Sequence, residues 1–144
     1  MNTTPLPEHD LSALDIDWVE DQIYAHNQRA TGRDDALGLA FVIRDESRMI
    51  GACAGYSWAG SAELKQLWVD PAHRGRGHGR ALLDAFIAEA SRRGVARIWV
   101  ASYDFQAPEF YGAAGFVRMA EFTGWPEGHS NIILRLALPR GVDG

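Results

Sequence analysis

The stretch VDPAHRGRGHGRALLDAF, residues 69–86, joins a turn rich in glycine and arginine to the start of an amphipathic pattern. Glycines at 75, 77 and 79 alternate with other residues, and the apolar residues after them recur at helical spacing. A turn between a strand and a helix leaves the first helical N–H groups without partners, and the helix dipole adds partial positive charge there. The stretch therefore predicts a strand, an anion-binding turn and a helix.

Three interpretations of this turn compete. A P-loop requires GxxxxGK followed by Ser or Thr, but the only lysine of the sequence is Lys65, outside the turn. A dinucleotide fingerprint requires GxGxxG, whereas these glycines follow GxGxG, and 144 residues are few for a paired nucleotide fold with a substrate domain. An exposed turn with arginines for solubility is the third. The turn alone leaves this last interpretation level with a phosphate site, for which pyrophosphate is the natural ligand.

Composition sets the outer limits. An apolar fraction of 47% and a charged fraction of 23% are ordinary for a globular protein, and 144 residues predict one domain, 1–144, with a loose arm over 1–10. A net charge of -5 argues against nucleic acid as the main partner. A single cysteine, Cys53, excludes an internal disulfide and suits a reducing cytoplasm. We find no signal peptide or membrane span, so the sequence predicts a cytoplasmic protein.

Apolar periodicity predicts mixed helices and strands around one sheet. A helix is expected over about 17–30, capped by Asp15 or Asp17, and a long helix after the glycines ends near Gly94. A short helix lies within 107–116. Strands are expected at 39–45, 48–58, 62–70, 96–102, 117–122 and 131–138. Cys53, Trp68 and Trp99 lie on these strands and are expected to belong to the core.

Two motifs together resemble the GNAT superfamily of N-acetyltransferases. LWVDPAHRGRGHGRALL resembles its acetyl-CoA-binding signature, with Arg74, Gly77 and Gly79 at the characteristic spacing, and FQAPEFYGAAGF resembles its later motif around Tyr111. The resemblance covers residues 39–138 and identifies a small single-domain member of bacterial type. It implies an α/β (α+β) GNAT fold: a mixed, mostly antiparallel sheet of six to seven strands, flanked by helices and splayed into an acyl-CoA cleft.

The resemblance implies acetyl-CoA as co-substrate. The five histidines show no HxH or HExxH spacing, so no metal is expected. Backbone groups of the central strand are expected to bind the pantetheine arm and to polarise the thioester carbonyl, and the glycine-rich turn is expected to bind the pyrophosphate. The cofactor-binding residues are then Leu67, Trp68, Val69, Arg74, Gly75, Arg76, Gly77, His78, Gly79, Arg80, Asp104 and Ala107. Many relatives carry Asn seven residues before the tyrosine, where this sequence has Asp104, which cannot donate as Asn does.

The implied chemistry is direct attack of an amine on the acetyl thioester, with both substrates bound together. Tyr111 is expected to protonate the leaving thiolate, the alternative being a core aromatic residue. Glu63 lies eleven residues before Arg74, where histone-type relatives carry a catalytic glutamate, so it is the expected base. A solvent-facing strand residue and a water chain stay open as alternatives.

The acceptor is expected to be a primary amine of a small molecule or protein. Candidate acceptor-binding residues are Tyr24, Asn27, Trp58, Trp125 and His129. His129 is also a candidate base, with a surface turn residue as its alternative. Two further hypotheses are an acyl-CoA-binding module without turnover and a ping-pong enzyme that needs Cys53 as nucleophile. A homodimer is compatible with the resemblance.

Overall fold

The computed structural model describes residues 3–139. The chain divides into two compact units, one up to residue 34 and one from residue 35. In the first unit, residues 3–10 form no helix or strand and are exposed. Within the described residues, no helix is both long and apolar enough to cross a membrane.

Helix α1 (Ala13–Thr31) begins four residues before the position expected from the sequence. The Ser12 side chain accepts a hydrogen bond from the Asp15 backbone N–H at 3.1 Å, so Ser12 caps the helix and the assignment of the cap to Asp15 or Asp17 is wrong. The helix ends at Gly32, whose φ of 70° is the left-handed conformation that favours glycine at a C-terminus.

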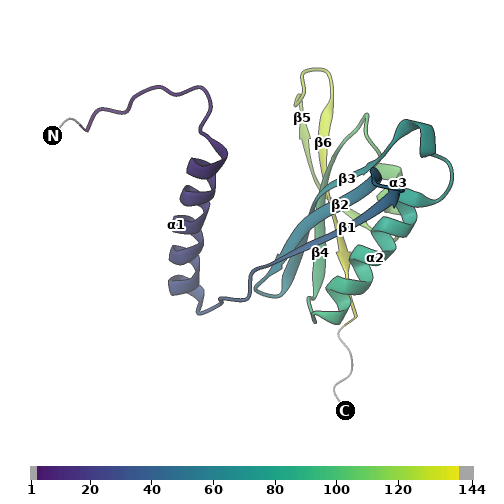
Figure 1. Ribbon diagram of the computed structural model, residues 1–144, viewed down its shortest axis with the longest axis horizontal. Coiled ribbons are helices and arrows are strands. Elements are labelled where there is room, and N and C mark those ends of the chain that lie inside the picture. The colour runs from purple at the N-terminus through teal and green to yellow at the C-terminus, as the bar shows by residue number, and fades with distance from the viewer. Residues whose placement is uncertain (1–2, 140–144) are drawn as a thin grey trace, which may run out of the picture. The chain divides into compact units, whose positions relative to one another are not determined.

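The second unit is one six-stranded sheet in the order β1-β2-β3-β4-β6-β5 (Figure 1). Its strands are β1 (Leu37–Asp45), β2 (Arg48–Trp58), β3 (Ser61–Val69), β4 (Arg97–Tyr103), β5 (Val117–Thr123) and β6 (Ser130–Ala137). Only β3 and β4 pair in parallel; the other neighbours are antiparallel. The mixed, mostly antiparallel sheet predicted from the sequence is confirmed.

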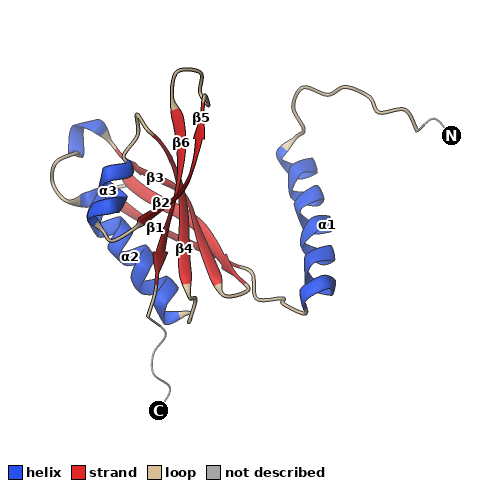
Figure 2. Cartoon of the chain, turned by 180° about the vertical axis from the view of Figure 1, so that it is seen from behind, coloured by secondary structure: helices blue, strands red, loops and turns tan. Residues whose placement is uncertain are grey.

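Two helices cover one face of this sheet, as Figures 1 and 2 show from opposite sides: α2 (His78–Arg92) and α3 (Pro108–Ala113). A short 3-10 turn, η1 (Pro71–His73), precedes α2. The apolar face predicted for the long helix is buried through Leu82, Leu83, Phe86 and Ala90. It packs on strand residues that include Leu39, Leu64 and Ile98.

The three residues expected in the core, Cys53, Trp68 and Trp99, differ in burial. Cys53 is buried, and burial raises the pKa of its thiol, as an inert core cysteine requires. Trp68 is 46% exposed, so its assignment to the core is wrong. Successive strand residues point to opposite faces, and Trp68 points away from the face that buries Val69. Trp99 is half-buried.

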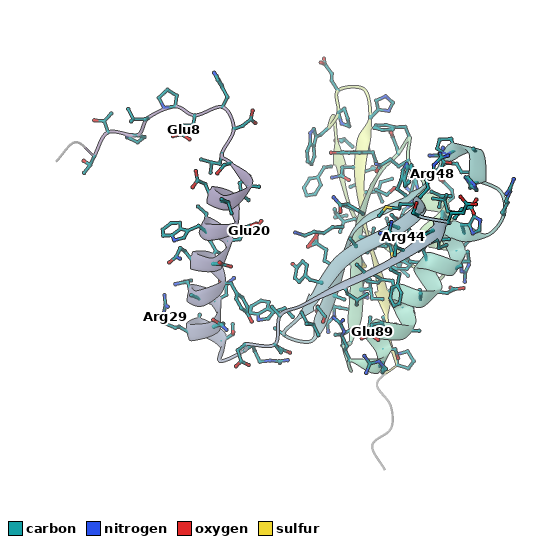
Figure 3. All side chains as sticks on the ribbon, viewed as in Figure 1. Glu8, Glu20, Arg29, Arg44, Arg48 and Glu89 are labelled. Atoms are coloured by element: carbon teal, nitrogen blue, oxygen red, sulfur yellow. The ribbon has the colours of Figure 1, made fainter. Side chains whose placement is uncertain are left out.

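The C-terminal end of α2 is tied to the sheet by Arg93. Its guanidinium donates to the Ser57 hydroxyl at 2.9 Å, to the backbone oxygens of Leu37 and Gly38, and to Glu89 at 2.8 Å. Arg92 also binds Glu89, which Figure 3 labels on α2. These hydrogen bonds, first from Arg92 and then from Arg93, lower the pKa of Glu89 from 4.5 to about 2.

We expect Glu89→Gln to lower the melting temperature at pH 6 but not near pH 2. The carboxylate stabilises the fold fully above its ordinary pKa of 4.5, and this contribution is lost as the pH falls toward the folded-state pKa of about 2. Thermal melts of wild type and variant across pH 2–6 test this. Glu121→Gln, on the exposed strand β5, is the control, and a difference that persists at pH 2 would contradict the assignment.

Candidate active site

The site begins where β3 and β4 separate. Their parallel pairing runs from Ser61 opposite Arg97 to Leu64 opposite Val100 and then stops, although both strands continue. Backbone groups of β3 beyond Leu64 therefore face a gap instead of a neighbouring strand on that side. This is the splay expected from the sequence, and it provides hydrogen-bonding groups for an extended ligand.

A β-bulge in β3 marks the same place. Ala54 of β2 pairs with Gln66 and Gly55 pairs with Leu64, so Lys65 is the extra residue. A Cβ atom on Gly55 would lie 1.9 Å from the Glu63 carbonyl oxygen, which is far closer than two non-bonded atoms can approach. Glycine at this position thus permits the close approach of β2 to the bulge.

A cleft of about 900 Å³ occupies the gap between the strands. One wall is β3 with the glycine-rich turn, and the other is β4 with α3 and the loop before it. It brings together eleven residues expected from the sequence: Leu67, Trp68, Val69, Arg74, Gly75, Gly77, His78, Gly79, Arg80, Ala107 and Tyr111. Arg76 and Asp104 are not among its lining residues.

The glycine-rich turn has the conformation that an anion-binding loop needs. Gly75 and Gly77 have φ values of 77° and 83°, and α2 begins immediately afterwards, at His78, without a side-chain cap. Its first N–H groups are therefore available to a ligand in the cleft. The Arg74 Nε donates to the Val69 backbone oxygen at 3.1 Å, which holds the turn against the end of β3.

Tyr111 lies on α3 between two other aromatic rings. It is 8% exposed, with ring centroids of Phe110 and Phe116 at 5.2 and 5.6 Å. Burial, and to a lesser degree Cys53, raises the pKa of its phenol. The phenol therefore stays protonated at neutral pH while its residue lines the cleft.

Glu63 lies apart from the main cleft, in a smaller pocket of about 160 Å³ that also contains Trp58. The Tyr56 hydroxyl donates to Glu63 Oε1 at 3.2 Å. Burial, followed by the charge and the hydrogen bond of Glu63, raises the pKa of Tyr56. Trp99 completes the aromatic lining. A carboxylate among three aromatic rings suits an organic cation.

Asp104 joins two loops instead of facing the cleft. One carboxylate oxygen lies 2.9 Å from His129 Nδ1, and the other accepts the Ser130 backbone N–H at 3.0 Å. The His129 ring meets Phe105, a cleft residue, edge to face with centroids 5.0 Å apart. The pair therefore places His129 beside the cleft wall.

Some site residues escaped the sequence analysis. Lys65, Gln66, Phe105, Gln106 and Phe110 line the main cleft, and Tyr56 lines the smaller pocket. Phe105 and Phe110 belong to the second motif, and membership of this motif was the signal that could have identified them.

Tyr24 and Asn27, which the sequence predicted as acceptor-binding residues, lie half-buried on α1, in the first unit. Trp125 meets the Tyr103 ring edge to face at 5.6 Å.

The geometry agrees with what sequence comparison finds. Residues 6–116 match the model of the Acetyltransferase (GNAT) family, so the chain belongs to this family.

Two relatives extend this result. An uncharacterised N-acetyltransferase of Methanocaldococcus jannaschii is 39% identical over 66 residues, 44% of this chain. A mycothiol acetyltransferase of Clavibacter michiganensis is 38% identical over 90 residues, 62% of this chain. Each match covers only 29% of the relative.

Solved structures share the fold over nearly the whole chain. A protein from Agrobacterium tumefaciens superposes with a TM-score of 0.84 at 23% identity, covering 94% of this chain and all of the other (100%). An acetyltransferase from Bacillus cereus has a TM-score of 0.76 at 23% identity and covers 92% of this chain and 98% of its own. The expected GNAT fold is confirmed.

Proposed function

We propose that this chain transfers an acetyl group from acetyl-CoA to a primary amine of a small molecule or protein, by direct attack with both substrates bound. The observation that carries the proposal is the cleft of about 900 Å³ between the separated strands, which connects the glycine-rich turn with Tyr111. We also propose that residues 1–144 form one N-acetyltransferase domain.

The cleft fits acetyl-CoA by the chemistry of its walls. The free edge of β3 around Leu67, Trp68 and Val69 offers backbone groups to the amide-bearing pantetheine arm. The turn from Arg74 to Arg80 offers N–H groups and guanidinium donors to the pyrophosphate. When bound, acetyl-CoA supplies an activated acetyl thioester.

Tyr111 is assigned as the general acid. Its raised pKa keeps a proton on the phenol at neutral pH, so the group is available as a donor. As the C–S bond breaks, the hydroxyl donates this proton to the thiolate leaving group, and a proton lost from the attacking nitrogen restores the phenol.

Glu63 is assigned as the base on the acceptor side. Glu63 pairs with Trp99 and lies one residue before Leu64, the last residue of β3 that pairs with β4. The carboxylate accepts a hydrogen bond from Tyr56 and is surrounded by rings, where an ammonium group is stabilised before it gives up its proton.

The remaining acceptor contacts are assigned to Trp58, Trp125 and His129. Trp58 lines the pocket of Glu63, and His129 contacts the Phe105 ring on the wall of the cleft. Tyr24 and Asn27 of α1 remain predicted acceptor-binding residues.

A CoA-release assay with acetyl-CoA across a panel of primary amines tests the proposal. The panel should include diamines, amino acids, aminoglycosides and peptides with free N-termini. We expect release that depends on one class of amine. Binding of acetyl-CoA without amine-dependent release across the panel would favour a binding module instead.

We expect Gly77→Asp to weaken acetyl-CoA binding at least about tenfold, or about 1.4 kcal/mol, because it places a carboxylate at the proposed pyrophosphate site. Gly94→Asp is the matched control: both glycines have positive φ, 83° and 76°, and a Cβ meets no atom within 4 Å at either. Gly94 does not line the cleft. Equal affinity losses in the two variants, measured by calorimetry, would show that the turn is not the pyrophosphate site.

A further inference from the structure

Lys65 is the only lysine in the sequence, and its position is unusual. It is the extra residue of the β3 bulge, at the point where β3 leaves β4. The residue is exposed and lines the main cleft. The residue that carries the only side-chain primary amine of the sequence thus lies on the wall of the proposed acetyl-CoA site.

The ammonium group of Lys65 is held on the acceptor side of this wall. Its Nζ lies 5.3 Å from the centroid of the Tyr56 ring, within the range of about 6 Å for a cation–π contact. The hydroxyl of the same ring donates to Glu63 Oε1 at 3.2 Å. Lys65 therefore connects the main cleft to the pocket in which we place the base.

We propose that Lys65 is acetylated by the acetyl-CoA bound in this chain's own cleft. The proposal rests on the proposed function, because it uses the same thioester, acid and base. A neighbouring amine at a fixed position also gains from proximity, since the reaction within one complex replaces an encounter in solution.

The reaction balances with the residues already assigned. The Lys65 ammonium gives one proton to Glu63, which releases it to solvent. The Nζ lone pair then forms a C–N bond to the acetyl carbon while the C–S bond breaks. Tyr111 protonates the departing thiolate, and the second proton lost from nitrogen restores the phenol. The products are acetyl-lysine, CoA and one released proton.

Acetylation would change the acceptor pocket. Acetyl-lysine carries no charge, so the Tyr56 ring loses its cation. Glu63, which lines the pocket with Tyr56, then faces the acceptor with one positive charge fewer nearby. The modification would thus make the pocket more favourable to a cationic acceptor.

The test is to incubate the purified full chain with acetyl-CoA alone and to follow its intact mass. We expect one acetyl group per chain, which fragmentation locates at Lys65 and not at the N-terminal amine. Lys65→Arg, which keeps a positive charge, should gain no acetyl group there. The first-order rate constant of the modification should saturate with acetyl-CoA and be independent of protein concentration.

Variants separate this reaction from acetylation in free solution. Gly77→Asp should slow the modification at subsaturating acetyl-CoA by about the factor by which it weakens binding, and Gly94→Asp should not. An equal rate constant in Gly77→Asp and wild type, a rate constant that rises with protein concentration, or an unmodified Lys65 would overturn the proposal. An unmodified Lys65 in a protein with amine-dependent CoA release would leave the proposed function standing, whereas failure to bind acetyl-CoA would remove both.

Discussion

Tyr111→Phe is expected to lower kcat by at least about 100-fold, within the range of about 10²–10⁴ that general acid–base catalysis contributes. The substitution removes the proton donor but keeps the ring, whose contacts with Phe110 and Phe116 hold α3 in place. The affinity for acetyl-CoA should therefore change little. Steady-state kinetics with the amine identified in the panel, together with calorimetry, measure both quantities.

The pH dependence adds a second criterion for the phenol. A general acid is active below its pKa, and burial raises the pKa of Tyr111 above its ordinary value of 10. At pH values up to 10, ionisation of Tyr111 should therefore cause no decrease in the wild-type kcat. If Tyr111→Phe retained half of wild-type kcat, another residue or water would be the acid.

Gly55→Ala is expected to lower the free energy of unfolding by about 3 kcal/mol or more, at the upper end of what overpacking costs. The new Cβ would lie 1.9 Å from a backbone oxygen, that of Glu63, so relief requires movement of β2 or β3. That movement would also disturb the bulge at Lys65. Denaturant titration gives the stability, and acetyl-CoA binding reports on the bulge.

The matched control for this substitution is Gly38→Ala. Gly38 also lies in a strand, β1, where a Cβ meets no atom within 4 Å. Its effect should stay within about 0.5 kcal/mol, as at most surface positions. Equal stabilities of the two variants would mean that β2 does not approach the bulge as closely as described.

The elements and the glycine-rich turn that lines the cleft could be predicted because their signals are local. Leu82, Leu83 and Phe86 recur with the helical period, and the helix they predicted buries all three. The conformation of Gly75 and Gly77 follows from the demands of a strand–helix turn. The Ser12 cap was also readable, since Ser followed three residues later by Asp15 before apolar residues is a capping pattern.

The proposed acceptor side could not be predicted, because it depends on contacts between distant segments. Asp104 and His129 are 25 residues apart, and nothing local in the sequence links them. Trp68 lies in a strand with several apolar residues, but it points away from the buried face of the sheet, and the residue is 46% exposed. The pocket of Glu63 likewise requires the register of β2, β3 and β4.

Calorimetric titration of the wild-type chain with acetyl-CoA tests the central claim most directly. The account predicts saturable binding with one molecule per chain, competed by CoA and weakened in Gly77→Asp but not in Gly94→Asp. No binding, or binding that Gly77→Asp leaves unchanged, would contradict the claim that the cleft between β3 and β4 is an acetyl-CoA site.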